Sequence, residues 1–532
     1  MPTSQSTMSV ATSVQSMNLG LPGHGTLFPA NPFRSESSTS GPHGTSWTNV
    51  NVLLLTSLLA VRPDQMVELD LTRTESLRSY ENVRIAESGL ALGPLAGKWI
   101  EMFRGRSDFG LLTGVYWMRD RLFFLDSPLP AGSDGGDVYM WDKGKPKKVL
   151  EVREQGVVYM RGNGGKLFIP GADSTEAWDF GNIYRSLDGG ITWSKFRSVP
   201  RAVHIWDMAH WRGKMYVSTG SFKDKAGYGA VLESSDEGKS WRETLIAYPP
   251  DRKKQFARCY SLIPLRDGLY ASFAVVDNDA KKPGPKSSFD FYRFDGKKWT
   301  ALKLFSEAQR TPYFGLRHRD FQKYALVGTS TGGYMLSDGQ IEAIDGLEGK
   351  IVFDFERVGK EEMVAVATDP KTKLSAVYLS SLPELIDGTG RFDKAYSLPA
   401  GQEGLTIRTA MGRLLVGTRA TGGGRLLAEA NAPSGIAVTV PIKITNEGKL
   451  TVKWTGEQPA GTVLQFQVHS SRSEADLQRM TVWPRAREGA APASFDITGV
   501  PKGLVFLQIR VVLRGGDLIS PSLRSIRIES KR

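Results

Sequence analysis

Two closely related octapeptides stand out in the sequence, "SLDGGITW" (Ser186–Trp193) and "SSDEGKSW" (Ser234–Trp241). Both follow the pattern Ser-x-Asp-x-Gly-x-x-Trp. Asp and Ser side chains can hydrogen-bond to nearby backbone groups, and the glycines Gly190 and Gly238 permit the positive φ of a tight turn. Each tryptophan can then fold back as an apolar plug on the strand edge. The pattern therefore predicts a turn between two antiparallel strands, and none of its residues requires a substrate.

The octapeptides belong to a longer repeat. Each follows a short apolar strand, "KLFIP" in the first copy and "KMYVS" in the second, and weaker copies continue on both sides. The turn aspartates are separated by 46, 48, 59 and 43 residues, and they are Asp142, Asp188, Asp236, Asp295 and Asp338. Spacings of about 40 to 50 residues with four strands per unit are typical of a β-propeller. Seven units fit between Gly114 and Ala430, and a six-bladed ring is the alternative if one weak unit is an insertion.

The segments before and after the repeat differ from it in sequence and set the expected domain boundaries. Residues 433–532 contain alternating strands with frequent turn signals, which predict a β-sandwich of immunoglobulin or fibronectin type III kind with Trp454 in its core. Residues 1–62 are rich in Ser, Thr, Gly and Pro and are expected to be a disordered leader. The apolar segment 49–61 is too short for a membrane span but has the length of a signal-peptide core. The propeller is therefore placed at 63–432, with the segment 81–92 as the strand that closes its ring.

Composition narrows the functional classes. The net charge of +12 comes from scattered basic residues without a nucleic-acid-binding motif, so no nucleic-acid partner is expected. Cys259 is the only cysteine, which excludes an intrachain disulfide. The histidines show no metal-ligand spacing, and the Gly-rich "RGNGG" (161–165) lacks the Lys-Ser/Thr of a phosphate-binding loop. We expect no metal, no cofactor and no transmembrane segment, in an exported monomer that is extracellular or periplasmic.

The octapeptides resemble the Asp-box, or BNR repeat, of sialidase-like β-propellers. The resemblance covers residues from about 80 to 430, and it implies that the box lies on the blade periphery, away from a central site. Members of this superfamily include sialidases, other glycosidases, lectin-like proteins and sorting receptors. The nearest match to the Phe/Tyr-Arg-Ile-Pro motif of true sialidases is "VRIA" (Val83–Ala86), which lacks the aromatic residue and the proline. The resemblance therefore implies a member of the superfamily that is not a sialidase.

Ligands of propellers bind at the axial opening, where the innermost strands converge. Aligning Met208 with Leu262 places His204 and Arg258 at equivalent positions of neighbouring blades. Polar and aromatic residues of the entry strands are the predicted ligand-binding residues, namely His204, Trp206, Asp207, Arg258, Tyr260, Tyr313 and Arg317. The candidates for catalysis are Asp207, Asp354 and Arg258, and the alternative for each residue is a hydrogen bond between blades.

The favoured function is binding of glycans or glycoconjugates at the axis without catalysis. A glycoside hydrolase or lyase that uses axial arginine and carboxylate residues is the first alternative. A protein-interaction scaffold is the second. The fold class, an all-β propeller followed by a sandwich, is common to all three.

Overall fold

The computed structural model describes residues 66–531 except 82, 87–88, 107–110, 128–134, 143, 153, 158, 175–178, 224–225, 278–288, 306–317, 322, 360, 447, 481–482, 484–486 and 489–493. The leader 1–62, with its apolar segment 49–61, lies outside the described residues. Two compact units divide the rest. We call residues 101–428 the first unit, and residues 66–100 together with 429–531 the second unit.

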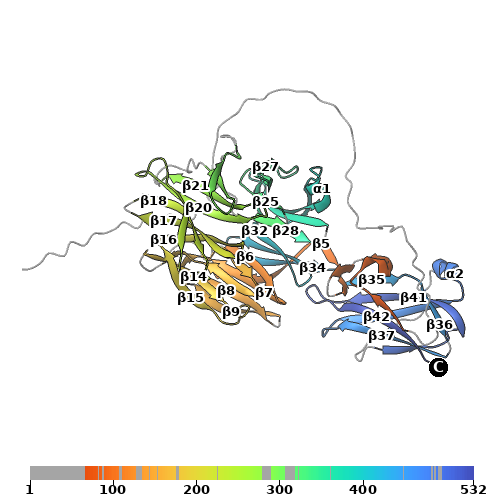
Figure 1. Cartoon of the computed structure of the whole chain (residues 1–532). Coiled ribbons are helices and arrows are strands. Elements are labelled where there is room, and N and C mark those ends of the chain that lie inside the picture. The colour runs from red at the N-terminus through yellow and green to blue at the C-terminus, as the bar shows by residue number, and fades with distance from the viewer. Residues whose placement is uncertain are drawn as a thin grey trace, which may run out of the picture. The chain divides into compact units, whose positions relative to one another are not determined.

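The first unit is all-β and consists of four-stranded antiparallel sheets that follow one another in chain order (Figure 1). The sheets of its first half are β6 (Leu111–Met118) to β9 (Lys145–Val152), with β7 (Arg121–Ser127) and β8 (Gly136–Asp142); β11 (Arg161–Asn163), β12 (Lys166–Pro170), β14 (Phe180–Ser186) and β15 (Ser194–Pro200); and β16 (Ala202–Trp211), β17 (Lys214–Lys223), β18 (Ala226–Ser234) and β19 (Arg242–Ala247). Two short strands, β10 (Glu154–Gly156) and β13 (Ala172–Ser174), extend the last of these beyond β16.

The second half continues the pattern. Its sheets are β20 (Gln255–Pro264), β21 (Leu269–Asp277), β22 (Phe289–Phe294) and β23 (Trp299–Leu302); β24 (His318–Phe321), β25 (Tyr324–Gly328), β26 (Gly333–Ser337) and β27 (Gln340–Ala343); β28 (Ile351–Val358), β29 (Glu362–Thr368), β30 (Ser375–Ser381) and β31 (Asp393–Ser397); and β32 (Glu403–Ala410), β33 (Arg413–Arg419), β34 (Arg425–Asn431) and β5 (Pro94–Arg104). A short helix, α1 (Leu382–Ile386), follows β30. Second strands such as β7 and β33 are buried along nearly their whole length, as expected for continuous apolar runs covered on both faces.

The ring closes differently from the sequence prediction. The first strand of the last sheet, β32, packs beside β6, the first strand of the first sheet. The outermost strand of the last sheet is β5, which precedes β6 in the chain, whereas segment 81–92 was expected there. That segment forms β3 (Val83–Ala86) and β4 (Gly89–Leu92), and β4 pairs with β42 (Ser522–Lys531) of the second unit. The physical reason is burial, because Leu90 and Leu92 are completely enclosed in the core of the second unit. The expected boundaries 63–432 and 433–532 stay predictions.

The two octapeptides form the turns that their sequence predicts. Ser186 donates to Asp188 Oδ1 at 2.7 Å, and Asp188 accepts the N–H of Thr192 at 2.9 Å. Gly190 lies at φ 89° and donates its N–H to Ser186 Oγ. The second octapeptide repeats these bonds with Ser234, Asp236, Gly238 and Ser240. Because Asp188 is occupied by its own turn, these hydrogen bonds lower its pKa, and it serves the architecture.

The second unit contains two antiparallel sheets around one apolar core. One sheet has β1 (Val67–Asp70), β3, β4, β42, β37 (Lys449–Glu457) and β40 (Ser494–Ile497); the other has β2 (Leu77–Glu81), β35 (Ser434–Thr439), β36 (Ile442–Asn446), β38 (Val463–Ser471), β39 (Arg487–Glu488) and β41 (Gly503–Arg514). The 3₁₀ turn η1 (Thr74–Ser76) precedes β2, and helix α2 (Glu474–Arg479) follows β38. Trp454 is 8% exposed and packs against Phe466 with ring centroids 4.7 Å apart, as expected of a core tryptophan.

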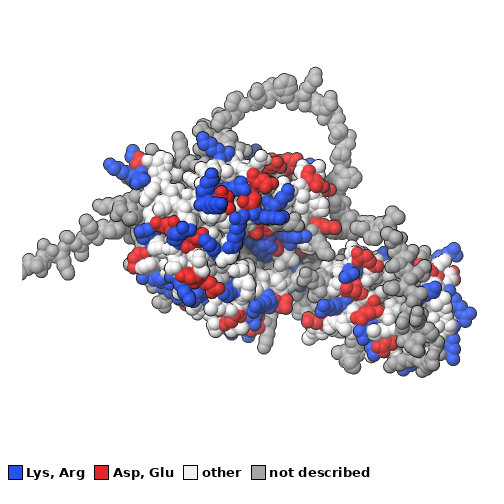
Figure 2. Space-filling view, viewed as in Figure 1, with Lys and Arg blue, Asp and Glu red and all other residues white. Residues whose placement is uncertain are grey.

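Charged side chains are mixed over the visible surface. Figure 2 shows lysines and arginines interspersed with aspartates and glutamates on the face that it displays. Such mixing is typical of a solvated protein surface. Among the described helices, none is both long enough and apolar enough to cross a membrane.

Candidate functional site

Five of the innermost strands of the first unit share a β-bulge. The bulge lies where the register with the second strand shifts, between Leu112 and Gly114, Ile205 and Asp207, Cys259 and Ser261, Val352 and Asp354, and Gly404 and Thr406. A bulge adds one unpaired residue and re-aims the side chains around it. Trp206 and Tyr260 are therefore equivalent bulge residues, and His204 and Arg258 are equivalent two residues earlier, as the alignment of Met208 with Leu262 predicted.

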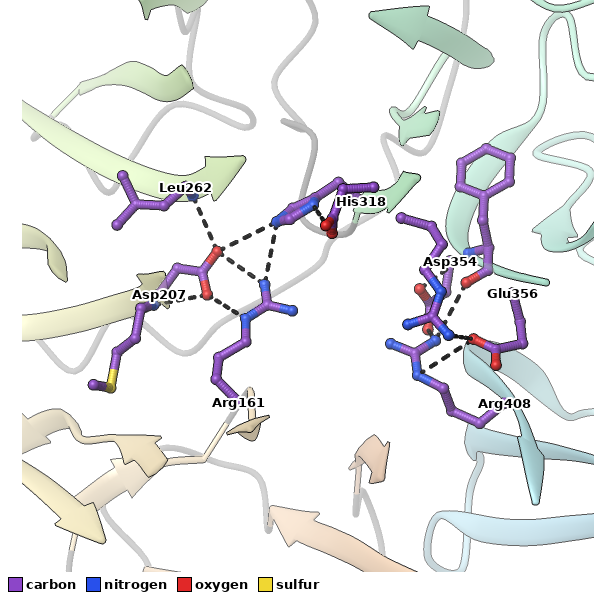
Figure 3. A network of polar contacts seen from close by, with 11 residues as sticks. Arg161, Asp207, Leu262, His318, Asp354, Glu356 and Arg408 are labelled. Atoms are coloured by element: carbon purple, nitrogen blue, oxygen red, sulfur yellow. Dashed lines mark hydrogen bonds and ion pairs between the residues drawn. The ribbon is translucent and has the colours of Figure 1, made fainter. Parts of the chain in front are cut away.

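Asp207 lies directly after its bulge and is the centre of a closed polar network (Figure 3). Its two oxygens accept Nε and Nη2 of Arg161 at 2.8 and 2.9 Å. They also accept the backbone N–H of Met208 at 2.8 Å and that of Leu262, on the next innermost strand, at 3.0 Å. His318 Nε2 lies 3.7 Å from the same carboxylate. Burial raises the pKa of Asp207, but Arg161 and His318 outweigh it, and the pKa falls to about 2.

Asp354 repeats this arrangement three sheets further on (Figure 3). It too follows its bulge, and it accepts the N–H of Ile407, on the next innermost strand, at 3.1 Å. Arg408 Nη1 donates to it at 2.6 Å, and Thr406 Oγ1 donates at 2.7 Å. Both aspartates are completely buried. An enclosed carboxylate whose lone pairs are already taken is a structural group that joins neighbouring sheets.

A second carboxylate extends the network beside Asp354. Glu356 Oε2 lies 2.5 Å from Arg319 and 3.9 Å from Arg408. Burial raises the pKa of Glu356, although both guanidinium groups oppose the shift. We call this whole set the ion-pair network, and its members are Arg161, Asp207, His318, Arg319, Asp354, Glu356 and Arg408.

A different kind of cluster lies at the beginning of two neighbouring innermost strands, β16 and β20. We call it the entry cluster, and its members are His204, Trp206, Arg258 and Tyr260. The Trp206 ring lies between its neighbours, with centroids 4.8 Å from His204 and 4.9 Å from Tyr260. Arg258 lies 5.5 Å from the Trp206 ring centroid, and its Nη1 donates to Tyr260 OH at 3.4 Å. Trp206 is 4% exposed, whereas the other three side chains are partly exposed.

Gly220 explains how these bulky side chains fit together. It lies on β17 opposite His204. A Cβ atom there would lie 3.3 Å from Trp206 Nε1 and 3.4 Å from both His204 and Arg258. The missing side chain therefore leaves the space in which the three residues converge.

The polar atoms of the entry cluster are poorly satisfied. In the described part of the chain, Trp206 Nε1 and His204 Nδ1 are buried without a hydrogen-bond partner. Burial, and then the charge of Arg258, lowers the pKa of His204 well below its usual range, so the imidazole is neutral. An unsatisfied buried donor costs about 1–3 kcal/mol. A ligand at the entry cluster could supply the missing partners.

The structure brings together four of the predicted site residues and separates others from them. His204, Trp206, Arg258 and Tyr260 form the entry cluster, while Asp207 belongs to the ion-pair network with the catalytic candidate Asp354. The remaining two ligand-binding candidates, Tyr313 and Arg317, lie outside the described residues. Arg84, the sialidase-motif match, is in β3 of the second unit.

Sequence reasoning missed Arg161, which we assigned to a glycine-rich turn. The register supplies the signal that could have found it, because Arg161 lies two residues before the last pair of its hairpin. Arg319 and Arg408 occupy the same position in their hairpins. An arginine two residues before the last pair of the first hairpin in a repeat unit therefore predicts a member of the ion-pair network. No group of three or more potential metal-ligating residues occurs in the described segments.

Comparison with known proteins gives distant structural similarities. No protein-family model and no curated protein matches the chain. A GH74 enzyme of Niastella koreensis has a TM-score of 0.41 at 11% identity, over 64% of this chain and 59% of that protein. A PL25 ulvan lyase has a TM-score of 0.40 at 10% identity, over 64% of this chain and 96% of that one. The GH93 α-L-arabinofuranosidase of Fusarium graminearum, solved with arabinobiose, has a TM-score of 0.37 at 13% identity, over 55% and 99%. Similarities this distant do not assign a function to this chain.

Proposed function

We propose that the protein binds a glycan or glycoconjugate at the entry cluster, on the axis of a seven-bladed β-propeller followed by an immunoglobulin-like β-sandwich. The four-stranded sheets of the first unit and the packing of β32 beside β6 support the propeller. The two sheets around one core support the sandwich. The resemblance of the octapeptides to the Asp-box supports a place in the sialidase-like superfamily, whose members commonly act on or bind carbohydrate.

The composition of the entry cluster carries the proposal. Sugars present an apolar ring face and a rim of hydroxyl groups, so their sites combine aromatic rings with a few fixed polar groups. His204 and Tyr260 offer partly exposed rings, and Trp206 packs between them. Arg258 and the imidazole offer polar groups that lack a full set of partners among the described residues.

Hydrolysis is the second candidate, and Glu356 is the observation in its favour. A carboxyl group whose pKa is raised by burial has the property of a general acid. The predicted pair Asp207 and Asp354 is less suited to catalysis, because backbone N–H groups and guanidinium groups occupy both carboxylates. Binding without turnover is therefore the preferred function.

A glycan array combined with a panel of fluorogenic glycosides tests the proposal. We expect the wild type to retain a defined set of glycans and to release no fluorophore. Tyr260→Ala should weaken retention at least about fivefold, because the loss of an aromatic contact costs about 1 kcal/mol or more. Tyr248→Ala is the matched control, since Tyr248 is 40% exposed and packs against Arg252 outside the cluster.

The remaining outcomes separate the candidates. Turnover by the wild type that disappears in Glu356→Gln would establish the hydrolase and overturn the preferred function. If the wild type neither retains a glycan nor cleaves a glycoside, both carbohydrate functions are wrong, and an interaction scaffold is left.

A further inference from the structure

The first and last sheets of the first unit meet where the chain passes from β5 to β6. Gly105 and Arg106 directly follow β5, and the Gly105 N–H donates to the carbonyl oxygen of Gly424, directly before β34, at 2.8 Å. The N–H of Arg106 donates instead to Asp126 Oδ2 of the first sheet at 3.3 Å. These two consecutive residues therefore connect the last sheet with the first.

Two buried aspartates of the first sheet receive this connection. Asp126 on β7 and Asp137 on β8 are direct cross-strand partners, and their side chains are 2% and 1% exposed. The guanidinium group of Arg106 forms an ion pair with Asp137, and its Nε lies 4.0 Å from Asp126 Oδ2. Lys148 Nζ lies 3.7 Å from Asp137 Oδ1, and the Tyr139 hydroxyl donates to Asp137 Oδ2 at 3.2 Å. We call these five residues the closure cluster.

The contacts in the closure cluster are divided unequally between the two carboxylates. Asp137 Oδ1 accepts no hydrogen bond but has Lys148 as a counter-charge, whereas Asp126 Oδ1 is buried with no hydrogen-bond partner in the described part of the chain. Asp126 Oδ1 faces Gly105, where a Cβ atom would lie only 2.5 Å from it. Like charges directly opposite each other in a sheet are destabilising. A proton on Asp126 removes this repulsion, because it leaves Asp137 as the single anion that faces Arg106.

The electrostatic surroundings favour that proton. Burial raises the pKa of Asp126 above its ordinary value of 3.8, and the charge of Asp137 adds to the rise, although the backbone N–H and the guanidinium group of Arg106 oppose it. Burial, followed by the charge of Asp137, also raises the pKa of Tyr139 to about 12, so the phenol stays protonated and remains a donor. If the two sheets separate, water reaches Asp126 and its pKa returns toward the ordinary value. The closed contact therefore holds the proton more tightly than the open one.

We propose that the closure cluster is a pH-sensitive contact between the first and last sheets, which is stable while Asp126 carries a proton and weakens when Asp126 ionises. Because the pKa of Asp126 is raised in the closed state, its stabilising contribution is complete below pH 3.8 and is lost as the pH rises through the raised value. Asp126 is the cross-strand partner of Leu112, the residue before the bulge of β6, so the weakened contact extends to an innermost strand. This inference does not depend on glycan binding.

Hydrogen exchange of the full-length protein between pH 4 and 7 tests the inference. The Gly105 and Arg106 amides report on the closure cluster, and the amides of β29 and β30 are the reference for unfolding of the whole unit. After correction for the intrinsic pH dependence of exchange, protection of Gly105 and Arg106 should fall relative to the reference as the pH rises. Asp126→Asn cannot ionise, so its two amides should keep their protection and exchange about fivefold or more slowly than those of the wild type at pH 7, as for removal of an incompletely paired buried charge.

Two further variants give opposite and graded effects. Asp137→Asn is the matched control, because it removes the counter-ion of Arg106 and should accelerate exchange of the same amides throughout the pH range. Arg106→Gln removes the cation that opposes the rise in the pKa of Asp126, so it should enlarge the fall in protection between pH 4 and 7. The Arg106 side chain is 54% exposed and tolerates substitution, so this variant decides the question if Asp126→Asn does not fold.

Three results would overturn the inference. The first is protection of the wild-type amides that follows the reference at every pH. The second is a fall in protection that persists in Asp126→Asn, and the third is a fall in Arg106→Gln no larger than that of the wild type. None of these results bears on the proposed glycan function, which the array tests separately.

Discussion

The ion-pair network and the entry cluster both lie on innermost strands of the first unit, yet they differ in how their charged groups are paired. Asp207 and Asp354 are fully buried, and each accepts guanidinium and backbone N–H groups. In the entry cluster, by contrast, Arg258 has no ion pair among the described residues, and its guanidinium donates to the Tyr260 hydroxyl at 3.4 Å. Paired buried charges stabilise the fold, whereas an unpaired guanidinium stays available for a ligand.

The bulges explain why the two regions lie so near each other along one strand. In β16, Trp206 is the bulge residue and Asp207 follows it, so adjacent side chains enter different environments. The same step separates Tyr260 from Ser261 in β20. The bulge in β16 thus positions both Asp207, which binds residues of neighbouring sheets, and the aromatic ring of Trp206 in the entry cluster.

The largest expected effect on the free energy of unfolding comes from a substitution that disrupts the ion-pair network. Asp207→Asn removes the charge that faces Arg161 and leaves a largely enclosed guanidinium without its counter-ion, so we expect a loss of about 3–5 kcal/mol in the free energy of unfolding. Urea denaturation measures it. Asp393→Asn is the control, because Asp393 is exposed and pairs with the exposed Arg391, so its substitution should change stability by less than about 0.5 kcal/mol. A stable Asp207→Asn variant with altered ligand binding would return Asp207 to the list of functional residues.

The succession of four-stranded antiparallel sheets could be predicted from the sequence because its turns are local. Ser186, Asp188 and Gly190 lie within five residues of one another, and their hydrogen bonds depend on little else. The order of strands followed from the same periodicity. The pairing of His204 with Arg258 was also predictable, since it needed only the alignment of two neighbouring repeats.

The rest depends on contacts between distant segments. The closing strand β5 and the segment 81–92 both mix apolar and charged residues, and their partners β34 and β42 lie hundreds of residues away. The role of Asp207 was equally hidden, because its partners Arg161, Leu262 and His318 come from three other sheets. The sequence can predict that a carboxylate lies on an innermost strand. It does not reveal how many hydrogen bonds that carboxylate accepts from other sheets, because these depend on the folded structure.

Two arginine substitutions, one in each region, compare the ion-pair network with the entry cluster, and their expected effects on the free energy of unfolding are smaller. Arg408→Gln leaves the buried Asp354 without its counter-ion and should cost about 3 kcal/mol. Arg258→Gln removes only cation–π contacts and a long hydrogen bond, so its cost should be about 1 kcal/mol. Urea unfolding of both variants gives the difference, about 2 kcal/mol. Equal costs would contradict the division into a structural network and a binding cluster.

The smallest expected effect is on the pH dependence of the free energy of unfolding, to which the entry cluster and the ion-pair network contribute in different pH ranges. His204 is held neutral in the fold but binds a proton near pH 6.5 when unfolded, so the unfolded state takes up more protons and stability falls as the pH drops below about 6.5. Asp207 has its pKa lowered to about 2 from 3.8, so its contribution is complete above pH 3.8 and is lost as the pH falls toward 2. Urea midpoints measured across this range should therefore decline in two stages. His204→Gln should flatten the upper stage and leave the lower one unchanged, and His210→Gln corrects for a partly buried imidazole whose pKa burial also lowers. An upper stage that persists unaltered in His204→Gln would mean that the imidazole of the entry cluster is not held neutral at a cost to the fold.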